Sequence, residues 1–373
     1  MKIAIVLSRC HKYGSSRYVL DTVNYFTKKG HEVHIFAHTC DPIENRKVFF
    51  HKLPRLNLGF ISREVSLSLI QTLLLKFYSF DVTISQPTRY FSPDVAEVQF
   101  VFKEWIGYQE RHGNKWGLAG VLLKMMESYN LKKVKKIIVL SNSVKNELIR
   151  NYGIDKEKIH VVYSGVNLKE FKPQNRKKYF NEIREKFNIP KTSFLLLFVG
   201  NPYDRKGVEY IIRSLPLLKS RNVRLLVSGK DDPKSYKELC NKLGVQDMVV
   251  FNPVLVSNVY KYFAAADAFV FPSIYEPFGL VVLEAMASGL PVITNTKAGV
   301  AEIIKDSKEG LLLNNPKNHE EIAQKIKYLI ENKKARRQIG IAARKKAKKY
   351  SWKKVAEERL KVLEEAALIK KRG

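Results

Sequence analysis

The second half of the chain repeats one pattern, in which a short apolar run ends in a small or polar residue and a helical stretch follows. Strands that are apolar along almost their whole length are typical of a parallel sheet with helices on both faces. Strands that alternate with helices predict βαβ crossover units. The apolar runs are FLLLFVG (194–200), VRLLVSG (223–229), MVVFN (248–252), AFVFPS (268–273) and PVITN (291–295). Helices are expected at 207–219, 233–243, 256–266 and from about residue 279.

The first half begins with the same alternation. KIAIVL (2–7) predicts a strand, a helical pattern ends at Gly30, and EVHIFA (32–37) predicts the next strand, which together make a parallel crossover unit. Further strands are expected at 48–53, 81–85, 94–100 and 158–166, a helix at 64–79, and a strand, turn and helix within 135–153.

Residues 167–192 are polar and hold two prolines, which is typical of a domain boundary. We therefore expect an α/β fold of two doubly wound Rossmann-like domains that face a central cleft. The expected divisions are an N-terminal domain (1–170), a C-terminal domain (171–345), and a C-terminal helix (346–373) that packs back on the N-terminal domain.

Length and composition agree with this picture. A chain of 373 residues suggests two domains. No apolar run reaches the roughly 18–20 residues of a membrane span, and the N-terminus lacks the roughly 7–15-residue apolar stretch of a signal peptide, so we expect a cytoplasmic protein. Cys10, Cys40 and Cys240 have no metal-ligand spacing and are expected to be reduced core thiols.

The formal net charge is +30. Such a field attracts polyanions, whether nucleic acid, anionic lipid or phosphorylated small molecules. A solvated, lysine-rich surface explains the charge equally well.

Ligands of open parallel sheets bind beyond the carboxyl ends of the strands, so the loops that follow strands are the first candidates for a site. One such loop contains Gly14, which lets backbone approach a ligand but is also usual in a tight turn. Another begins at Gly200 and carries Arg205 and Lys206 at the mouth of the next helix. That basic pair suits a diphosphate, and a solvated turn is the alternative.

A third loop lies in SIYEPFGLVVLEAMASGLPV (273–292). The helix is expected to begin near Phe278 or Gly279, which places Glu276 in the loop and Glu284 about one turn inside the helix. The N–H groups of Phe278, Gly279 and Leu280 can bind phosphate or sugar oxygens.

Two carboxylates beside these N–H groups suit a ligand with hydroxyls at both ends and phosphate in the middle, because a carboxylate accepts hydrogen bonds in pairs. That description fits a nucleotide sugar. The alternative is that Glu276 favours the helix dipole and Glu284 lies on the surface. The apolar flanks argue against it, since they predict that Glu284 is largely buried.

EPFGLVVLEAMASGLPV resembles the E-x7-E signature of the retaining glycosyltransferases of family 4, which have the two-domain GT-B fold. Arg205-Lys206-Gly207 resembles the basic loop of that family. KKIIVLSNSVKNEL, KIHVVYSGVN, VRLLVSG, VVFNPVLV and AGVAEII extend the resemblance over essentially the whole chain, most strongly from 130 to 312. Within the family, the pattern is most similar to bacterial lipopolysaccharide core glucosyltransferases.

The resemblance implies an N-terminal acceptor-binding domain and a C-terminal domain that binds a nucleotide-sugar donor. Arg205 and Lys206 would bind the donor diphosphate, Glu284 the ribose hydroxyls and Glu276 the transferred sugar. Gly14, Gly200 and the backbone of Phe278, Gly279 and Leu280 would also contact the donor. The catalytic residues implied are Glu276, Arg205 and Lys206.

The acceptor side departs from the family pattern. Many members carry a histidine where Gln99 stands here. Arg17, Asp94 and Gln99 are the acceptor-side candidates, and Glu97 and His112 lie nearby in the sequence.

Preorganised cations and N–H donors stabilise the charge that develops on a leaving diphosphate. No Asp-x-Asp motif is placed to bind a divalent ion, so no metal and no cofactor are expected. The resemblance implies that the acceptor attacks on the leaving-group face and that a donor phosphate oxygen takes the proton, with Glu276 orienting the sugar.

Residues 100–116 combine aromatic and basic side chains, and LAGVLLKMM and LKKVKK follow them. Basic, amphipathic, aromatic-tipped segments lie in membrane interfaces, so we expect peripheral association with the inner face of the cytoplasmic membrane. The alternative is that these aromatic residues form domain core.

The expected activity is retaining, metal-independent hexosyl transfer to a glycan or glycolipid acceptor, in lipopolysaccharide or other cell-envelope polysaccharide synthesis. A nucleic-acid-binding protein is the alternative from another class, but no helix-turn-helix or RNP motif is present, so no nucleic-acid partner is expected. A sugar-nucleotide-binding protein without turnover is a third reading. The sequence leaves open the nucleotide base and the sugar of the donor, for which UDP-glucose is one option. It also leaves the acceptor open.

Overall fold

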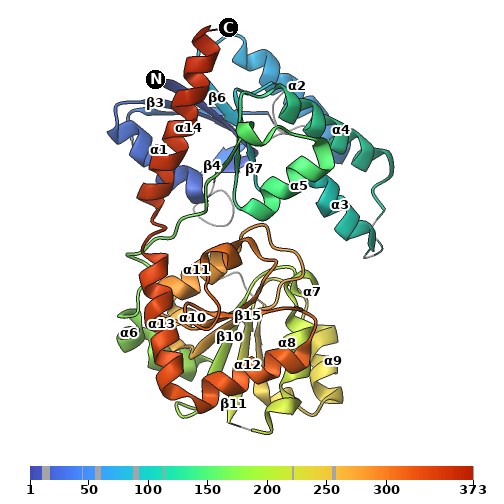
Figure 1. Cartoon of the computed structure of the whole chain (residues 1–373), viewed down its shortest axis with the longest axis vertical. Helices are drawn as coiled ribbons and strands as arrows, with labels where there is room; N and C mark the ends of the chain where they lie inside the picture. The colour runs from blue at the N-terminus through green and yellow to red at the C-terminus, as the bar shows by residue number, and fades with distance from the viewer. Residues whose placement is uncertain are drawn as a thin grey trace. The chain divides into compact units, whose positions relative to one another are not determined.

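The computed structural model describes residues 1–10, 17–43, 45–54, 60–86, 92–111, 113, 115–220, 222–253 and 258–372. The chain forms two compact units (Figure 1). Unit 1 comprises Met1–Ser164 and Trp352–Gly373, and unit 2 comprises Gly165–Ser351. The boundaries expected from the sequence, after residues 170 and 345, each lie six residues from the boundaries of these units, which fall after Ser164 and Ser351.

Unit 1 is built on a seven-stranded sheet in the order β5-β3-β1-β6-β7-β8-β9, and its neighbouring strands pair in parallel. Its strands are β1 (Lys2–Val6), β3 (Glu32–Ala37), β5 (Val48–Lys52), β6 (Val82–Ser85), β7 (Val95–Val98), β8 (Lys136–Val139) and β9 (Ile159–Val161). Its helices are α1 (Arg17–Lys28), α2 (Phe60–Leu75), α3 (Phe102–Arg111), α4 (Gly117–Lys133), α5 (Asn142–Tyr152) and α14 (Trp352–Arg372). Two-residue strands β2 (Arg9–Cys10) and β4 (Thr39–Cys40) pair separately.

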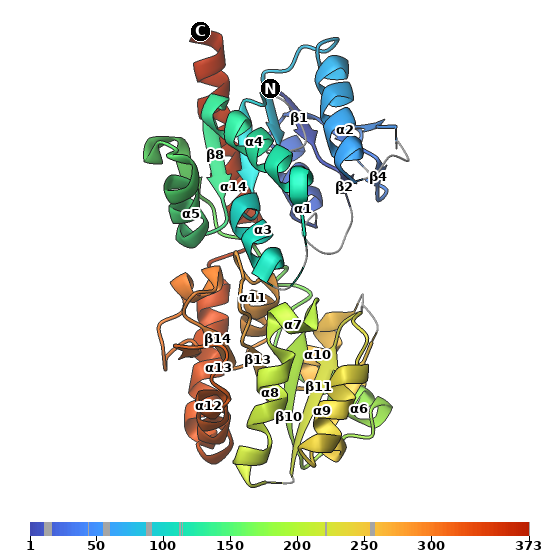
Figure 2. The same ribbon diagram turned by 90° about the vertical axis from the view of Figure 1, so that its right-hand side faces the viewer.

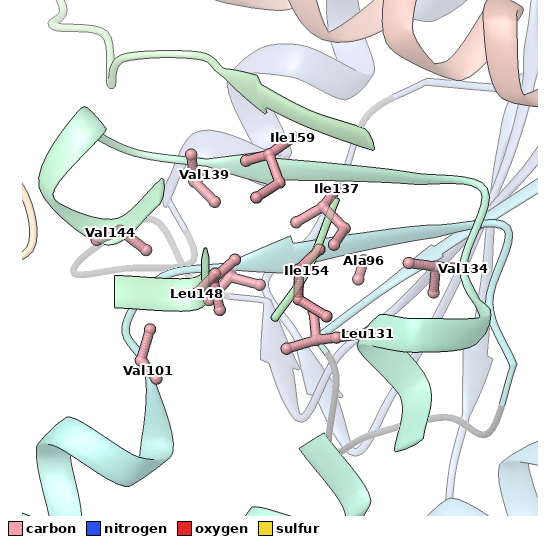
Figure 3. Close-up of a cluster of buried hydrophobic side chains, with 11 residues drawn as sticks. Ala96, Val101, Leu131, Val134, Ile137, Val139, Val144, Leu148, Ile154 and Ile159 are labelled. Atoms are coloured by element: carbon pink, nitrogen blue, oxygen red, sulfur yellow. The ribbon is translucent and has the colours of Figure 1, made fainter. Parts of the chain in front are cut away.

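One core cluster of unit 1 lies where α5 covers β8. Ile137 and Val139 of β8 meet Val144 and Leu148 of α5, and all four are at most 1% exposed. Figure 3 shows beside them Ile154, from the connection that follows the helix, and Ile159, the first residue of β9. Ile137 and Val139 lie two residues apart on one face of the strand, and Val144 and Leu148 lie four residues apart on one face of the helix, which accounts for this packing.

The C-terminal helix α14 belongs to unit 1 and packs beside α1 (Figure 1). Its Arg359 donates two hydrogen bonds to Glu97 of β7, at 2.6 and 3.0 Å, and both side chains are almost fully buried. Near the end of the helix, Lys370 binds Asp94 at 3.0 Å. These charged residues therefore tie the last segment of the chain to the first sheet.

Unit 2 is built on a six-stranded parallel sheet in the order β12-β11-β10-β13-β14-β15. Helices cover both of its faces (Figure 2). Its strands are β10 (Phe194–Val199), β11 (Val223–Ser228), β12 (Val249–Asn252), β13 (Ala268–Phe271), β14 (Val292–Asn295) and β15 (Leu311–Leu313). Its helices are α6 (Asn175–Lys186), α7 (Tyr203–Lys206), α8 (Val208–Ser214), α9 (Lys234–Lys242), α10 (Val259–Ala265), α11 (Leu280–Ala287), α12 (His319–Glu331) and α13 (Lys333–Ala347). The predicted pair of doubly wound α/β units is confirmed.

The polar stretch 167–192, expected to mark the domain boundary, contains α6, which packs against α10. The chain passes from unit 1 to unit 2 just before this stretch, between Ser164 and Gly165. One expectation about an individual element is wrong. The helix expected at 207–219 ends at Ser214, and a 3₁₀ turn (Pro216–Leu218) follows, because proline cannot donate the hydrogen bond that would continue the helix.

Candidate functional site

The sheet of unit 2 reverses its strand order between β10 and β13. The chain moves from β10 outward to β11 and β12, and then returns to the other side of β10 with β13. The connections that leave such a pair diverge to opposite faces, so the carboxyl ends of β10 and β13 border the usual ligand position of this fold. Both loops that the sequence singled out in this half start there.

Arg205 lies in α7, directly after β10, and reaches the loop that follows β13. Its Nη1 donates to the carbonyl oxygen of Tyr275 at 2.8 Å, and its own carbonyl oxygen accepts from the N–H of Ile274 at 2.8 Å. The Oγ of Ser273 also donates to that carbonyl, at 3.3 Å. The guanidinium is thus held by backbone atoms at the edge of the sheet.

Lys206 and Glu276 form an ion pair between the same two loops. The Lys206 side chain is 9% exposed and that of Glu276 is 12% exposed. Burial lowers the pKa of Lys206, which the charge of Arg205 also lowers, while Glu276 opposes that shift. The Nζ of Lys206 lies 5.2 Å from the ring centre of Phe271, the last residue of β13. Lys206, the residue predicted to bind the diphosphate, and Glu276, the residue predicted to bind the sugar, are therefore in direct contact with each other.

Two glycines let these loops approach so closely. Gly207 has φ of +79°, and a Cβ there would collide with the carbonyl oxygen of Pro272. Gly279 has φ of +106° and is the N-cap residue of α11. A Cβ there would lie 3.3 Å from Glu276 Cγ. Other residues at these two positions would force the loops apart.

The segment from Glu276 to Gly279 is braced from a third loop, which follows β14. Gly299 donates its N–H to the Glu276 carbonyl at 3.1 Å, and Val300 donates to the Phe278 carbonyl at 2.7 Å. A site that must present N–H groups at a helix N-terminus gains a fixed backbone from these bonds.

The remaining donor-side candidates are placed as follows. Gly200 follows β10, and its N–H donates to Ser228 at 3.0 Å. Phe278 is buried and Leu280 is the first residue of α11. Glu284 lies inside α11 and is partly buried.

The acceptor-side candidates fall at different edges of the unit 1 sheet. Gln99 directly follows β7, at the carboxyl edge, and is half-buried. Asp94 precedes β7, at the amino edge, where it accepts from Thr83 and binds Lys135 and Lys370. That placement does not support an acceptor role for Asp94. Arg17 begins α1, while its side chain, Gly14 and His112 lie outside the described residues.

Sequence reasoning missed Asn295 as a supporting residue. Its Nδ2 donates to the carbonyl of Ser273 at 2.6 Å, and both residues are buried. The signal was present, because Asn295 is a polar residue at the carboxyl end of a buried strand. It fixes the start of the loop that carries Glu276.

These positions can bind an anionic ester through Arg205 and the N-terminus of α11, and hydroxyls through Glu276 and Glu284. Within the described parts of the chain, no three His, Cys, Asp or Glu side chains gather as a metal site requires. None of the helices described there has the length and apolar content needed to cross a bilayer.

Two family models match the chain. The model described as Glycosyltransferase Family 4 matches residues 13–170, and the model described as Glycosyl transferases group 1 matches residues 180–346. A curated relative, "Uncharacterized glycosyltransferase MJ1607" of Methanocaldococcus jannaschii, is 34% identical over 265 residues, which is 68% of each chain. The D-inositol 3-phosphate glycosyltransferase of a Nocardioides species is 29% identical over 239 residues, 59% of this chain and 51% of its own. The chain thus spans about half the length of that relative.

Solved structures share the fold over nearly the whole chain. WaaG, described as a glycosyltransferase involved in lipopolysaccharide biosynthesis, has a TM-score of 0.80 at 22% identity, covering 97% of this chain and 99% of its own. Anabaena Alr3699/HepE, solved in complex with UDP and glucose, has a TM-score of 0.76 at 18% identity, covering 98% and 99%. At these identities the likeness concerns the fold, and it confirms the predicted two-domain GT-B class.

Proposed function

Because this chain belongs to glycosyltransferase family 4, we propose that it transfers a hexose, with retention of configuration, from a nucleotide-sugar donor to a glycan or glycolipid acceptor. The observation that carries the proposal is the meeting of Arg205, Lys206 and Glu276 where β10 and β13 end. Cations and carboxylates are the groups that a sugar diphosphate needs, on its linkage and its hydroxyls respectively.

In the proposed mechanism, the donor diphosphate binds between Arg205, Lys206 and the N-terminus of α11. Charge develops on the diphosphate oxygen as the bond to the sugar breaks, and these fixed groups stabilise that charge. Glu276 holds the transferred sugar and Glu284 the ribose. The acceptor hydroxyl attacks on the leaving-group face and passes its proton to a donor phosphate oxygen.

The mechanism requires no metal, because Arg205 and Lys206 supply the positive charge that a divalent ion would otherwise provide. Turnover in excess EDTA should therefore match turnover without it. Retention is tested by NMR of the product, in which an α-linked donor should yield an α-linked sugar.

For the donor we propose UDP-glucose, and for the pathway lipopolysaccharide or another envelope polysaccharide. Support comes from the shared fold with WaaG and with HepE, which was solved with UDP and glucose. The relatives named D-inositol 3-phosphate glycosyltransferase make a phosphorylated polyol the second acceptor class to test. The net charge of +30 suits either an anionic lipid surface or a phosphorylated acceptor.

We also place the protein in the cytoplasm, peripherally on the inner face of the membrane. Support comes from α4, whose exposed side chains include Leu118 (74%), Met125 (62%) and Tyr129 (47%). The exposed Lys132 and Lys133 follow them on the same helix. An apolar stripe flanked by lysines is the composition of a helix that lies in a membrane interface.

The proposal is tested by thermal shift with a panel of nucleotide sugars, followed by turnover with the best donor. Arg205→Ala should abolish the donor-induced shift and lower kcat by about 10²–10³-fold, the usual cost of losing one such donor group. Arg337→Ala is the matched control, since Arg337 is exposed on α13 of the same unit. Near-normal turnover of Arg205→Ala would refute the assignment.

Two other functions give different results in the same assays. A nucleic-acid-binding protein would show no donor-induced shift and would bind DNA or RNA with a steep salt dependence. A protein that binds sugar nucleotides without turnover would show the shift, but neither hydrolysis nor transfer to any acceptor.

A further inference from the structure

Two of the three cysteines lie directly opposite each other at the carboxyl edge of the unit 1 sheet. Cys10 ends β2 and Cys40 ends β4, and the parallel register of these short strands pairs the two residues. Each short strand follows a longer strand of the main sheet: β2 comes after β1, and β4 comes after β3. The pairing is closed on one side by a bond from the His38 N–H to the Ser8 carbonyl at 3.1 Å, and on the other by one from the Asp41 N–H to the Cys10 carbonyl at 2.8 Å.

This register satisfies the first geometric condition for a disulfide. Neighbouring strands lie about 4.8 Å apart, and the Cα atoms of disulfide-linked residues are usually about 4.4–6.8 Å apart. The two thiols already interact, since Cys10 and Cys40 share a side-chain hydrogen bond. Both cysteines are free thiols in this structure.

The two thiols differ in access and in acidity. Cys10 is fully buried, whereas Cys40 is half-buried. The hydrogen bond from Cys10 lowers the pKa of Cys40, and the same bond, with burial, raises the pKa of Cys10. The more accessible sulfur is thus the better nucleophile, because the thiolate is the reactive form.

We propose that Cys10 and Cys40 are a thiol–disulfide exchange site that takes a low-molecular-weight disulfide as its oxidant and closes to a reversible intramolecular disulfide. The Cys40 thiolate attacks one sulfur of the small disulfide, which releases one small thiol and leaves a mixed disulfide on Cys40. Cys10 then loses its proton and attacks the Cys40 sulfur, which releases the second small thiol. Two protein thiols are oxidised to one disulfide, and one small disulfide is reduced to two thiols.

The bond would join two connections that leave the sheet separately. Cys10 is the last described residue before 11–16, which hold Gly14, and Cys40 lies in the connection from β3 to β5. α1, which begins after that interval, packs against β2. A covalent link between Cys10 and Cys40 would therefore hold the backbone of β2 and that of β4 together at this edge of the sheet.

The experiment treats the folded full-length protein with oxidised glutathione, traps remaining thiols by alkylation, and maps the cysteines by mass spectrometry. The expected product has lost the mass of two hydrogen atoms, contains a peptide linked through Cys10 and Cys40, and returns to the starting mass with dithiothreitol. Cys240, buried alone in α9, should remain an alkylatable thiol after unfolding. Circular dichroism before trapping ensures that the reacting protein is folded.

Matched variants complete the test. Cys240→Ser should form the same link, and Cys40→Ser should leave Cys10 reduced under the same conditions. The proposal is overturned if glutathione remains attached to Cys40 without a bond to Cys10, if both thiols stay free at every glutathione ratio, or if the link forms only in denatured protein. None of these readouts depends on sugar transfer, so failure of the proposed activity leaves the test intact.

Discussion

Lys206 and Glu276 lie 70 positions apart in the sequence and form an ion pair at the edge of the unit 2 sheet. Burial of a lysine costs free energy unless a partner compensates. Truncation of either residue would leave the other charge buried, so a loss of activity in such a variant would mix catalysis with folding. Arg205 is the cleaner test of donor binding, because its guanidinium is held by carbonyl oxygens of Tyr275 and Asn201.

Glu127 is a fully buried carboxyl group of unit 1. It sits on α4, accepts from the Phe102 N–H at 3.0 Å and from the Tyr152 hydroxyl at 2.5 Å. Burial raises its pKa to about 8, and the charge of Glu147 adds to that shift, while the two hydrogen bonds oppose it. The folded protein therefore holds a proton on Glu127 near neutral pH.

The change Glu127→Gln should remove a pH dependence of stability. The folded pKa of Glu127 lies above the unfolded value of 4.5, so the folded state binds more protons and the unchanged protein loses stability as pH rises from 4.5 to 8. The slope is about 1.4 kcal/mol per pH unit for one group. We expect the Gln variant to gain stability relative to the unchanged protein over this interval, measured by urea unfolding at pH 5, 6, 7 and 8.

Glu110→Gln is the control for this measurement, since Glu110 is exposed on the neighbouring helix α3. It should keep the slope of the unchanged protein. Parallel stability curves for Glu127→Gln and the unchanged protein would mean that Glu127 does not hold a proton in the folded state.

At the scale of elements, most strands of both sheets were predictable, because short runs rich in apolar residues mark them. The three-residue strand β15 was not predicted. Helix α6 was not predicted either, because its sequence NRKKYFNEIREK is strongly polar. Arg184 of α6 is 1% exposed because it donates to Asp267 at 2.7 Å and to the carbonyls of Ser193 and Pro190 at 2.8 Å each. No hydrophobic pattern signals a helix whose buried face is anchored by a guanidinium.

The donor-side candidates were predictable for a related reason. Gly200, Arg205 and Glu276 follow strands whose ends are visible in the sequence, and parallel strands bring those ends to one edge. Asp94 was proposed as an acceptor-side residue because the sequence shows that a carboxylate flanks a strand. Its role depends on which end of the strand it occupies, and on partners as distant in the sequence as Lys370.

The exposed apolar stripe of α4 leads to a prediction about membranes. Burial of a leucine or methionine side chain contributes about 1.5–3 kcal/mol. The double change Leu118→Ser and Met125→Ser should therefore lower partitioning onto phosphatidylglycerol vesicles by at least about tenfold, measured by flotation at low salt.

Leu217→Ser is the control for vesicle binding, because Leu217 is 45% exposed on unit 2, outside the stripe. It should float like the unchanged protein. If the α4 double variant also floats unchanged, the stripe does not contact the membrane, and the positive charge alone accounts for binding.

At the scale of the whole molecule, the chain leaves unit 1 at Ser164 and returns to it at Trp352. All of unit 2 is thus inserted between two parts of unit 1, and α14 joins the sheet of unit 1 from beyond unit 2 in the sequence. The buried ion pair of Arg359 and Glu97 is one of the charged links between these parts.

Arg359→Met should therefore destabilise unit 1 without affecting unit 2. Removing one partner of a buried ion pair costs about 3–5 kcal/mol, and the variant leaves Glu97 without its guanidinium inside β7. Hydrogen exchange followed by mass spectrometry should show faster exchange in the strands of unit 1 and unchanged protection in β10 and β13. Lys361→Met, at an exposed position of the same helix, should exchange like the unchanged protein. Equal loss of protection in both units would show that they unfold as one cooperative body rather than as two.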